Sequence, residues 1–148
     1  MTRAGERIAY HNGRFVPERE VLVPFRDRGF KYGDAVFDTT RTFGHRVFKL
    51  REHVERLYRS LRYLRIDPGL TPAAMAEITE EVLRRNLPLL EPDNDYWVTQ
   101  RVSRGLDAAE REIWPQAGPT GPVTRQLTEA YCRLVDFDFV AQYLKRLG

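Results

Sequence analysis

One segment of the sequence, LREHVERLYRSLRYLRI, constrains the fold more than any other. Its large apolar residues recur every three or four positions, the spacing that places side chains on one face of an α-helix. These residues are Leu50, Val54, Leu57, Tyr58, Leu61 and Leu64. On the other faces, Glu52 and Arg56 stand four residues apart in the order that favours ion pairing along a helix. A helix with one apolar face must pack that face against another element, and Asp67-Pro68-Gly69 predicts where it ends.

Segments with strand-like composition lie on both sides of this helix. Asn12-Gly13 is a strong signal for a tight hairpin turn, and residues 35–43 and 96–103 are rich in β-branched and aromatic side chains. We therefore predict strands at residues 8–10, 15–16, 21–23, 35–43, 46–48 and 96–103. We interpret residues 24–34, which contain Gly29 and Gly33, as a loop without the fuller glycine pattern of a phosphate-binding loop.

Two further helices are predicted. Thr71 precedes Pro72 as a helix cap precedes the first helical residue, so the second helix spans about residues 71–86. Residues 124–147 have apolar positions at helical spacing, including Leu127, Tyr131 and Leu134, and predict a third. The elements together indicate an α+β fold, a small antiparallel sheet with helices packed on one face.

Composition limits the class of protein. The chain has 148 residues, the size of one ordinary domain, and its single cysteine, Cys132, excludes an internal disulfide framework. No apolar run has the length of a membrane helix or a signal core, so we expect a cytoplasmic protein. Of its 24 basic residues only three are lysine, and 21 acidic residues hold the net charge at +3. A mixed surface of this kind argues against nucleic-acid binding.

Common catalytic and metal-binding patterns are missing from the sequence. The three histidines, His11, His45 and His53, lack the paired spacing of metal ligands, so no metal site is predicted. There is no GxSxG motif, and we interpret Cys132 as a buried residue of the third helix. Carboxylates are so frequent that their pairing discriminates nothing.

The block YGDAVFDTTRTFGHRVFKLREHVERLYRSLRYLRI resembles the N-terminal region of class IV (fold type IV) aminotransferases. That family includes branched-chain and D-amino-acid aminotransferases and aminodeoxychorismate lyase, all dependent on pyridoxal phosphate. The opening hairpin and DYWVTQRVSRG are also similar to the family, so the resemblance covers residues 8–119. It implies the fold of the family's small N-terminal domain.

The resemblance assigns functions to five residues. Arg56 matches the arginine of the EHxxRL motif, which holds the cofactor phosphate, as a forked guanidinium can. Without the resemblance, Arg56 would be interpreted as a solvated residue off the apolar stripe. The substrate pocket would use Tyr32, Phe37, Arg41 and Arg104. Three of these have plain structural alternatives: Phe37 as a core residue, Tyr32 in loop packing and Arg104 as a surface charge beside a turn.

The resemblance also implies a lysine bonded to the cofactor, and none of Lys31, Lys49 or Lys145 matches it. Hence no catalytic residue is assigned. The tail GPVTRQLTEAYCRLV resembles the family's C-terminus, so we interpret the sequence as joined near residues 118–122, without the cofactor domain between. We therefore divide the chain into a small-domain-like part, residues 1–118, and a C-terminal helix, residues 119–148.

Three functions are compatible with the sequence. The first is a shortened class IV aminotransferase, inactive alone, whose full-length relatives move an amino group between an amino acid and a 2-oxo acid. The second is a non-enzymatic interaction module that keeps the dimer contacts of the family's small domain. As partner we expect either a second copy in a homo-oligomer or a complementary chain that carries the cofactor domain. The third, a basic nucleic-acid binder, has only the isoelectric point and the arginine-rich helix in its favour.

Overall fold

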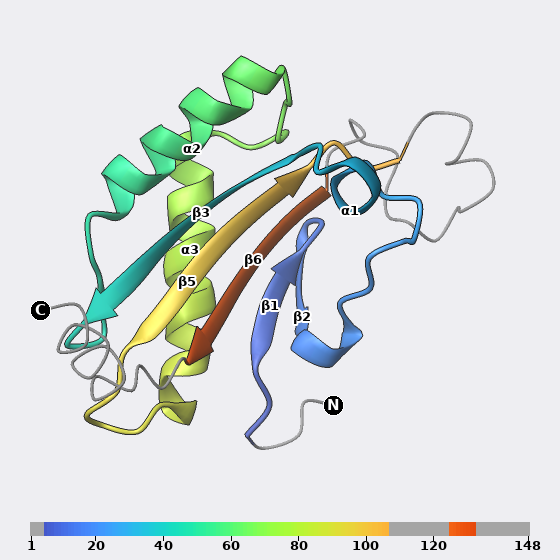
Figure 1. Cartoon of the computed structure of the whole chain (residues 1–148). Coiled ribbons are helices and arrows are strands. Elements are labelled where there is room, and N and C mark those ends of the chain that lie inside the picture. Colours follow the sequence, from blue (N-terminus) through green and yellow to red (C-terminus); the bar gives the residue numbers. More distant parts are fainter. Residues whose placement is uncertain (1–4, 107–124, 133–148) are drawn as a thin grey trace, which may run out of the picture.

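A six-stranded antiparallel sheet forms the centre of the molecule (Figure 1), in the computed structural model described here for residues 5–106 and 125–132. The strands follow the order β2-β1-β6-β5-β3-β4. Their bounds are β1 Ile8–His11, β2 Arg14–Pro17, β3 Ala35–Phe43, β4 Arg46–Val47, β5 Tyr96–Ser103 and β6 Arg125–Cys132. The predicted hairpin is confirmed, with Asn12 and Gly13 both at positive φ between β1 and β2.

Two long helices pack on the sheet, as predicted. α2 (Leu50–Leu64) runs alongside β3, and α3 (Pro72–Asn86) lies behind the sheet (Figure 1) and contacts β1, β5 and β6. The side chain of Thr71 accepts a hydrogen bond from the Ala74 N–H, so it caps α3 as expected. Shorter elements are α1 (Arg28–Tyr32) and the 3₁₀ turns η1 (Glu18–Glu20) and η2 (Leu87–Leu89).

The apolar stripe of α2 lies in the core. Leu57 and Leu61 are each 1% exposed and join Val36 of β3 and Val102 of β5 in one cluster. Strand β3 alternates between this buried face and the opposite face of the sheet: Val36 and every second residue to Thr42 are buried. This alternation decides which side chains of β3 meet α2.

Two expectations about local structure are wrong. Residues 21–23 form no strand in the described part of the chain, because they lie between the η1 turn and Pro24 and pair with no neighbouring strand. The segment from residue 24 to residue 34, predicted as a loop, contains α1, which begins after Asp27. The carboxylate of Asp27 accepts hydrogen bonds from the Gly29 and Phe30 N–H groups.

The predicted helix over residues 124–147 is also wrong where it can be compared. Residues Arg125–Cys132 form β6, which pairs with β5 over its whole length and with β1 at two positions. A strand between two others forms backbone hydrogen bonds with both neighbours. This non-local pairing outweighs the helical spacing of the apolar residues. Cys132 therefore ends a strand. The remainder, residues 133–147, and the proposed junction at residues 118–122 lie outside the described residues.

Candidate functional site

Asp38 is a carboxylate at a buried position of β3. Its side chain is 3% exposed and faces α2, on the same face of the strand as Val36 and Thr40. It accepts hydrogen bonds from Arg56 Nε at 2.6 Å, from Arg56 Nη2 at 2.8 Å and from His53 Nδ1 at 2.7 Å. His53 and Arg56 stand three residues apart on α2 and so reach the same point of the sheet. A buried carboxylate needs such partners, and here α2 supplies both.

The charge state of Asp38 follows from these contacts. Burial alone raises the pKa of Asp38, but the hydrogen bonds and positive charge of Arg56, together with the hydrogen bond from His53, outweigh it and lower the pKa below 3.8. The same contacts raise the pKa of Arg56. Asp38 is therefore ionised at neutral pH, and an ionised carboxylate only accepts hydrogen bonds. It follows that His53 carries a proton on Nδ1.

Arg56 joins this buried carboxylate to the surface. Its side chain is 57% exposed, although two of its nitrogens contact Asp38. A guanidinium is planar and presents two edges that can each bind two oxygens side by side. Asp38 occupies the edge formed by Nε and Nη2, and within residues 5–106 and 125–132 no side chain or carbonyl accepts a hydrogen bond from Nη1 on the other edge. This edge can bind an anion without breaking the ion pair.

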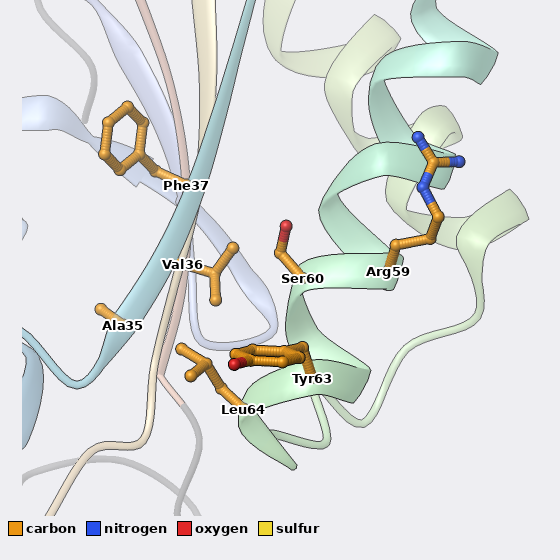
Figure 2. A pocket seen from close by; sticks show the side chains of 7 residues that line it. All are labelled: Ala35, Val36, Phe37, Arg59, Ser60, Tyr63 and Leu64. Atoms are coloured by element: carbon orange, nitrogen blue, oxygen red, sulfur yellow. The ribbon is translucent and has the colours of Figure 1, made fainter.

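A shallow hollow of about 520 Å³ lies between α2 and the first residues of β3. Figure 2 shows Val36 of β3 and Ser60 of α2 pointing toward one another across it, with Tyr63 and Leu64 at the end of the helix. The ring of Phe37 points away from α2, and Arg59 extends along the outer side of the helix (Figure 2). The Ser60 hydroxyl donates to the Arg56 carbonyl oxygen at 3.3 Å, so Ser60 lies one helical turn after Arg56 on α2.

Arg41 lines a second hollow of about 230 Å³, together with His53 and Trp97. Its guanidinium lies 4.4 Å from the centre of the Phe43 ring, and its Nε donates to the Thr42 carbonyl oxygen at 3.3 Å. Because His53 also contacts Asp38, it links this hollow to the Asp38–Arg56 pair. Arg41 therefore shares a hollow with His53, which contacts Asp38.

Tyr32 and Phe37 are both largely exposed, at 62% and 64%. Tyr32 ends α1, and the Lys31 ammonium lies 4.8 Å from the centre of the Tyr32 ring. Phe37 lies on the face of β3 opposite Asp38, where the Arg101 guanidinium stacks on its ring. Exposure excludes the alternative interpretation of Phe37 as a core residue. Their predicted contact with substrate stays a prediction.

Arg104 has its hydrogen bonds directed into the protein. Its Nε donates to Asp34 at 2.7 Å, and its two terminal nitrogens donate to the Leu64 and Arg65 carbonyl oxygens at the end of α2. These carbonyls have no partner within the helix, so Arg104 satisfies them. Its hydrogen bond, with a smaller opposing effect of burial and a further contribution from Arg28, lowers the pKa of Asp34. Substrate binding by Arg104 would compete with these contacts, and that role stays a prediction.

The described residues can bind the phosphate of pyridoxal phosphate better than they can bind its aldehyde. Phosphate oxygens match the exposed edge of Arg56. A lysine that forms a Schiff base needs a pocket that excludes water. Lys31 and Lys49 are exposed and lie over the rings of Tyr32 and Phe48, whereas Lys145 lies outside the described residues. Within the described ranges, the fit is thus limited to the phosphate.

Asp38, His53 and Arg56 form one cluster, and sequence reasoning singled out only Arg56. The signal was present: the alternation of residues 35–43 places Asp38 on the same face as the apolar Val36, where an unpaired carboxylate is not tolerated. A buried carboxylate on a strand beside an amphipathic helix needs a positively charged partner, and that helix can supply it. His53 and Arg56 were the residues to test for that role.

Metal-binding clusters and helices that could span a membrane are both absent from the described residues. Among residues 5–106 and 125–132 there is no group of three or more potential metal-binding side chains of His, Cys, Asp or Glu. No helix in the described part of the chain is long and apolar enough to cross a membrane.

Known proteins are similar to this chain over much of its length. A family model for amino-transferase class IV matches residues 35–122, which include Asp38, His53 and Arg56. A D-alanine aminotransferase of Bacillus licheniformis is 33% identical over 113 residues, covering 76% of this chain and 38% of that protein. An aminodeoxychorismate lyase of Bacillus subtilis is 40% identical over 80 residues, covering 53% of this chain and 27% of that protein.

Solved structures show the same fold. A branched-chain amino acid aminotransferase from Escherichia coli superposes with a TM-score of 0.67 at 21% identity, covering 85% of this chain and 41% of that one. The branched-chain aminotransferase of Thermoproteus uzoniensis with norvaline gives a TM-score of 0.67 at 24% identity, covering 86% and 41%. The predicted α+β fold is confirmed. The chain spans 27% to 41% of the length of these relatives and structures.

Proposed function

Since the chain belongs to the class IV aminotransferase family, we propose that its described residues supply the phosphate-binding part of a pyridoxal-phosphate site. The observation that carries this proposal is the exposed edge of Arg56, held beside the buried Asp38. Bound pyridoxal phosphate supplies the electron sink for amino-group transfer between an amino acid and a 2-oxo acid. In this chain, Arg56 would hold the phosphate, and Tyr32, Phe37, Arg41 and Arg104 are the proposed substrate contacts.

We do not assign the amino-transfer step to this chain alone. A lysine that forms a Schiff base needs a pocket that excludes water, and the two described lysines, Lys31 and Lys49, are both exposed. We propose that the lysine is supplied by another polypeptide, so that this chain acts in a complex. The apolar side chains exposed near α1 favour such a contact, since exposed apolar patches mark interaction surfaces. They are Leu22, Val23, Phe25, Phe30 and Tyr32.

The phosphate assignment is tested with pyridoxamine 5′-phosphate, which has no aldehyde and cannot react with surface lysines. Its binding to the wild type, Arg56→Gln and Arg62→Gln is measured by fluorescence titration, with pyridoxamine as the ligand that lacks phosphate. Arg62 is an exposed arginine on the same helix and serves as the matched control. We expect a phosphate-dependent preference that is lost in Arg56→Gln and kept in Arg62→Gln. Equal losses in both variants would show unspecific attraction to positive charge.

A further inference from the structure

The buried partner of Arg56 determines how its exposed edge is presented. An arginine side chain has four rotatable bonds, and binding an anion orders them at a cost in affinity. In this structure the Asp38 carboxylate already fixes the guanidinium through Nε and Nη2, both at less than 3 Å. Asp38 itself is fixed by its place in β3 and by His53. The long side chain of Arg56 is therefore ordered before any ligand arrives.

We propose that Asp38 is a positioning residue for anion binding: it holds one edge of the Arg56 guanidinium so that the other edge receives a phosphate. This inference rests on the proposed function and adds a residue to which that function assigns no role. His53 supports the arrangement by donating its Nδ1–H to Asp38 Oδ1, the oxygen that also accepts from Arg56 Nη2. Asp38 acts through Arg56 and touches no ligand.

Electrostatic repulsion between Asp38 and a phosphate opposes the gain from ordering Arg56. The negative charge of Asp38 repels the phosphate, and this repulsion decreases as the ionic strength rises. Ordering one long side chain in advance is worth about two- to tenfold in affinity. For Asp38 to act as proposed, the positioning effect must be the larger of the two at physiological salt. Loss of Asp38 should weaken phosphate binding although it removes a negative charge.

The experiment measures inorganic phosphate binding at 0.15 M salt by ³¹P NMR for the wild type, Asp38→Asn, Arg56→Gln and the double variant. Asn keeps the shape of Asp and removes its charge. We expect Asp38→Asn to bind phosphate about two- to tenfold more weakly. The double variant should bind no more weakly than Arg56→Gln, because Asp38 acts through Arg56. Unchanged or tighter binding by Asp38→Asn would overturn the proposal.

The outcomes separate this proposal from the proposed function. If Arg56→Gln binds phosphate as well as the wild type, the phosphate assignment itself fails. If Arg56 matters but Asp38→Asn has no effect, only the positioning role of Asp38 fails.

A second measurement needs no variant, in case Asp38→Asn does not fold. In the wild type, the Arg56 Nε–H signal is followed by ¹H–¹⁵N NMR during the phosphate titration. We expect its slow exchange with water to persist when phosphate is bound, because Asp38 keeps its hold on Nε. Faster exchange on phosphate binding would show that the ligand replaces Asp38, which contradicts the proposal.

Discussion

The ion pair between Asp38 and Arg56 makes stability depend on pH in a defined way. We expect Arg56→Gln to lower the free energy of unfolding at pH 7 by about 1–2 kcal/mol. Hydrogen bonds to charged groups contribute about 1.5–3 kcal/mol, and this range is discounted because Arg56 is 57% exposed to solvent. His53 still donates to Asp38 in the variant, so the carboxylate keeps one partner.

The sign of the pH dependence follows from the lowered pKa of Asp38. Burial raises that pKa, and Arg56 and His53 together lower it below 3.8, the ordinary value of an aspartate. The stability gained from the ionised carboxylate is therefore present above pH 3.8 and is lost as the pH falls through the folded-state pKa. The variant retains the burial and loses Arg56, so its Asp38 becomes protonated at a higher pH than in the wild type.

The assay is urea unfolding of the wild type, Arg56→Gln and Arg62→Gln at several pH values from 7 down to 3. We expect the difference between the wild type and Arg56→Gln to be largest at pH 7 and to shrink at the acidic end. Arg62→Gln should follow the wild type throughout, since Arg62 is exposed on the same helix. A loss in Arg56→Gln that stays constant over this pH range would refute the assigned ion pair.

Further predictions concern the core, the alkaline range and a helix cap. Leu57→Ala should cost about 2–5 kcal/mol in chemical unfolding, because Leu57 is 1% exposed in the α2 cluster; a loss below half of 1 kcal/mol would contradict that placement. Burial, with a smaller effect of Asp67, raises the pKa of Tyr58 to about 12 from 10.0, so wild-type stability should fall between pH 10 and 12. This fall should be smaller in Tyr58→Phe, where Tyr10 with its raised pKa still contributes, and unchanged in Tyr63→Phe, whose ring is 87% exposed. Thr71→Ala should cost about 0.5–2 kcal/mol through the lost cap of α3, and an unchanged urea midpoint would contradict the cap.

The elements predicted correctly are those that short-range physics determines. The stripe from Leu50 to Leu64 specifies α2, Thr71 with Pro72 specifies the start of α3, and Asn12-Gly13 requires the turn between β1 and β2. In each case a few neighbouring residues contain the whole signal, because helical spacing, capping and positive φ are local properties.

The features that the sequence did not predict depend on contacts between distant segments of the chain. Strand β6 exists because β1 and β5 leave a place between them, and neither neighbour is close to it in the sequence. The cluster of Asp38, His53 and Arg56 likewise joins β3 to α2 across 15 or more residues. The resemblance singled out Arg56 but gave no reason to connect it with Asp38. Pairing across the fold is the information that the local pattern lacks.

The central claim is that this chain recognises the cofactor through its phosphate while none of its lysines bonds to the aldehyde. The most direct test is to incubate the protein with pyridoxal phosphate, reduce with borohydride and map the modified lysines by mass spectrometry. We expect sparse labelling spread over Lys31, Lys49 and Lys145, and no transaminase turnover by the isolated chain. Stoichiometric labelling of a single lysine, accompanied by turnover, would contradict the account.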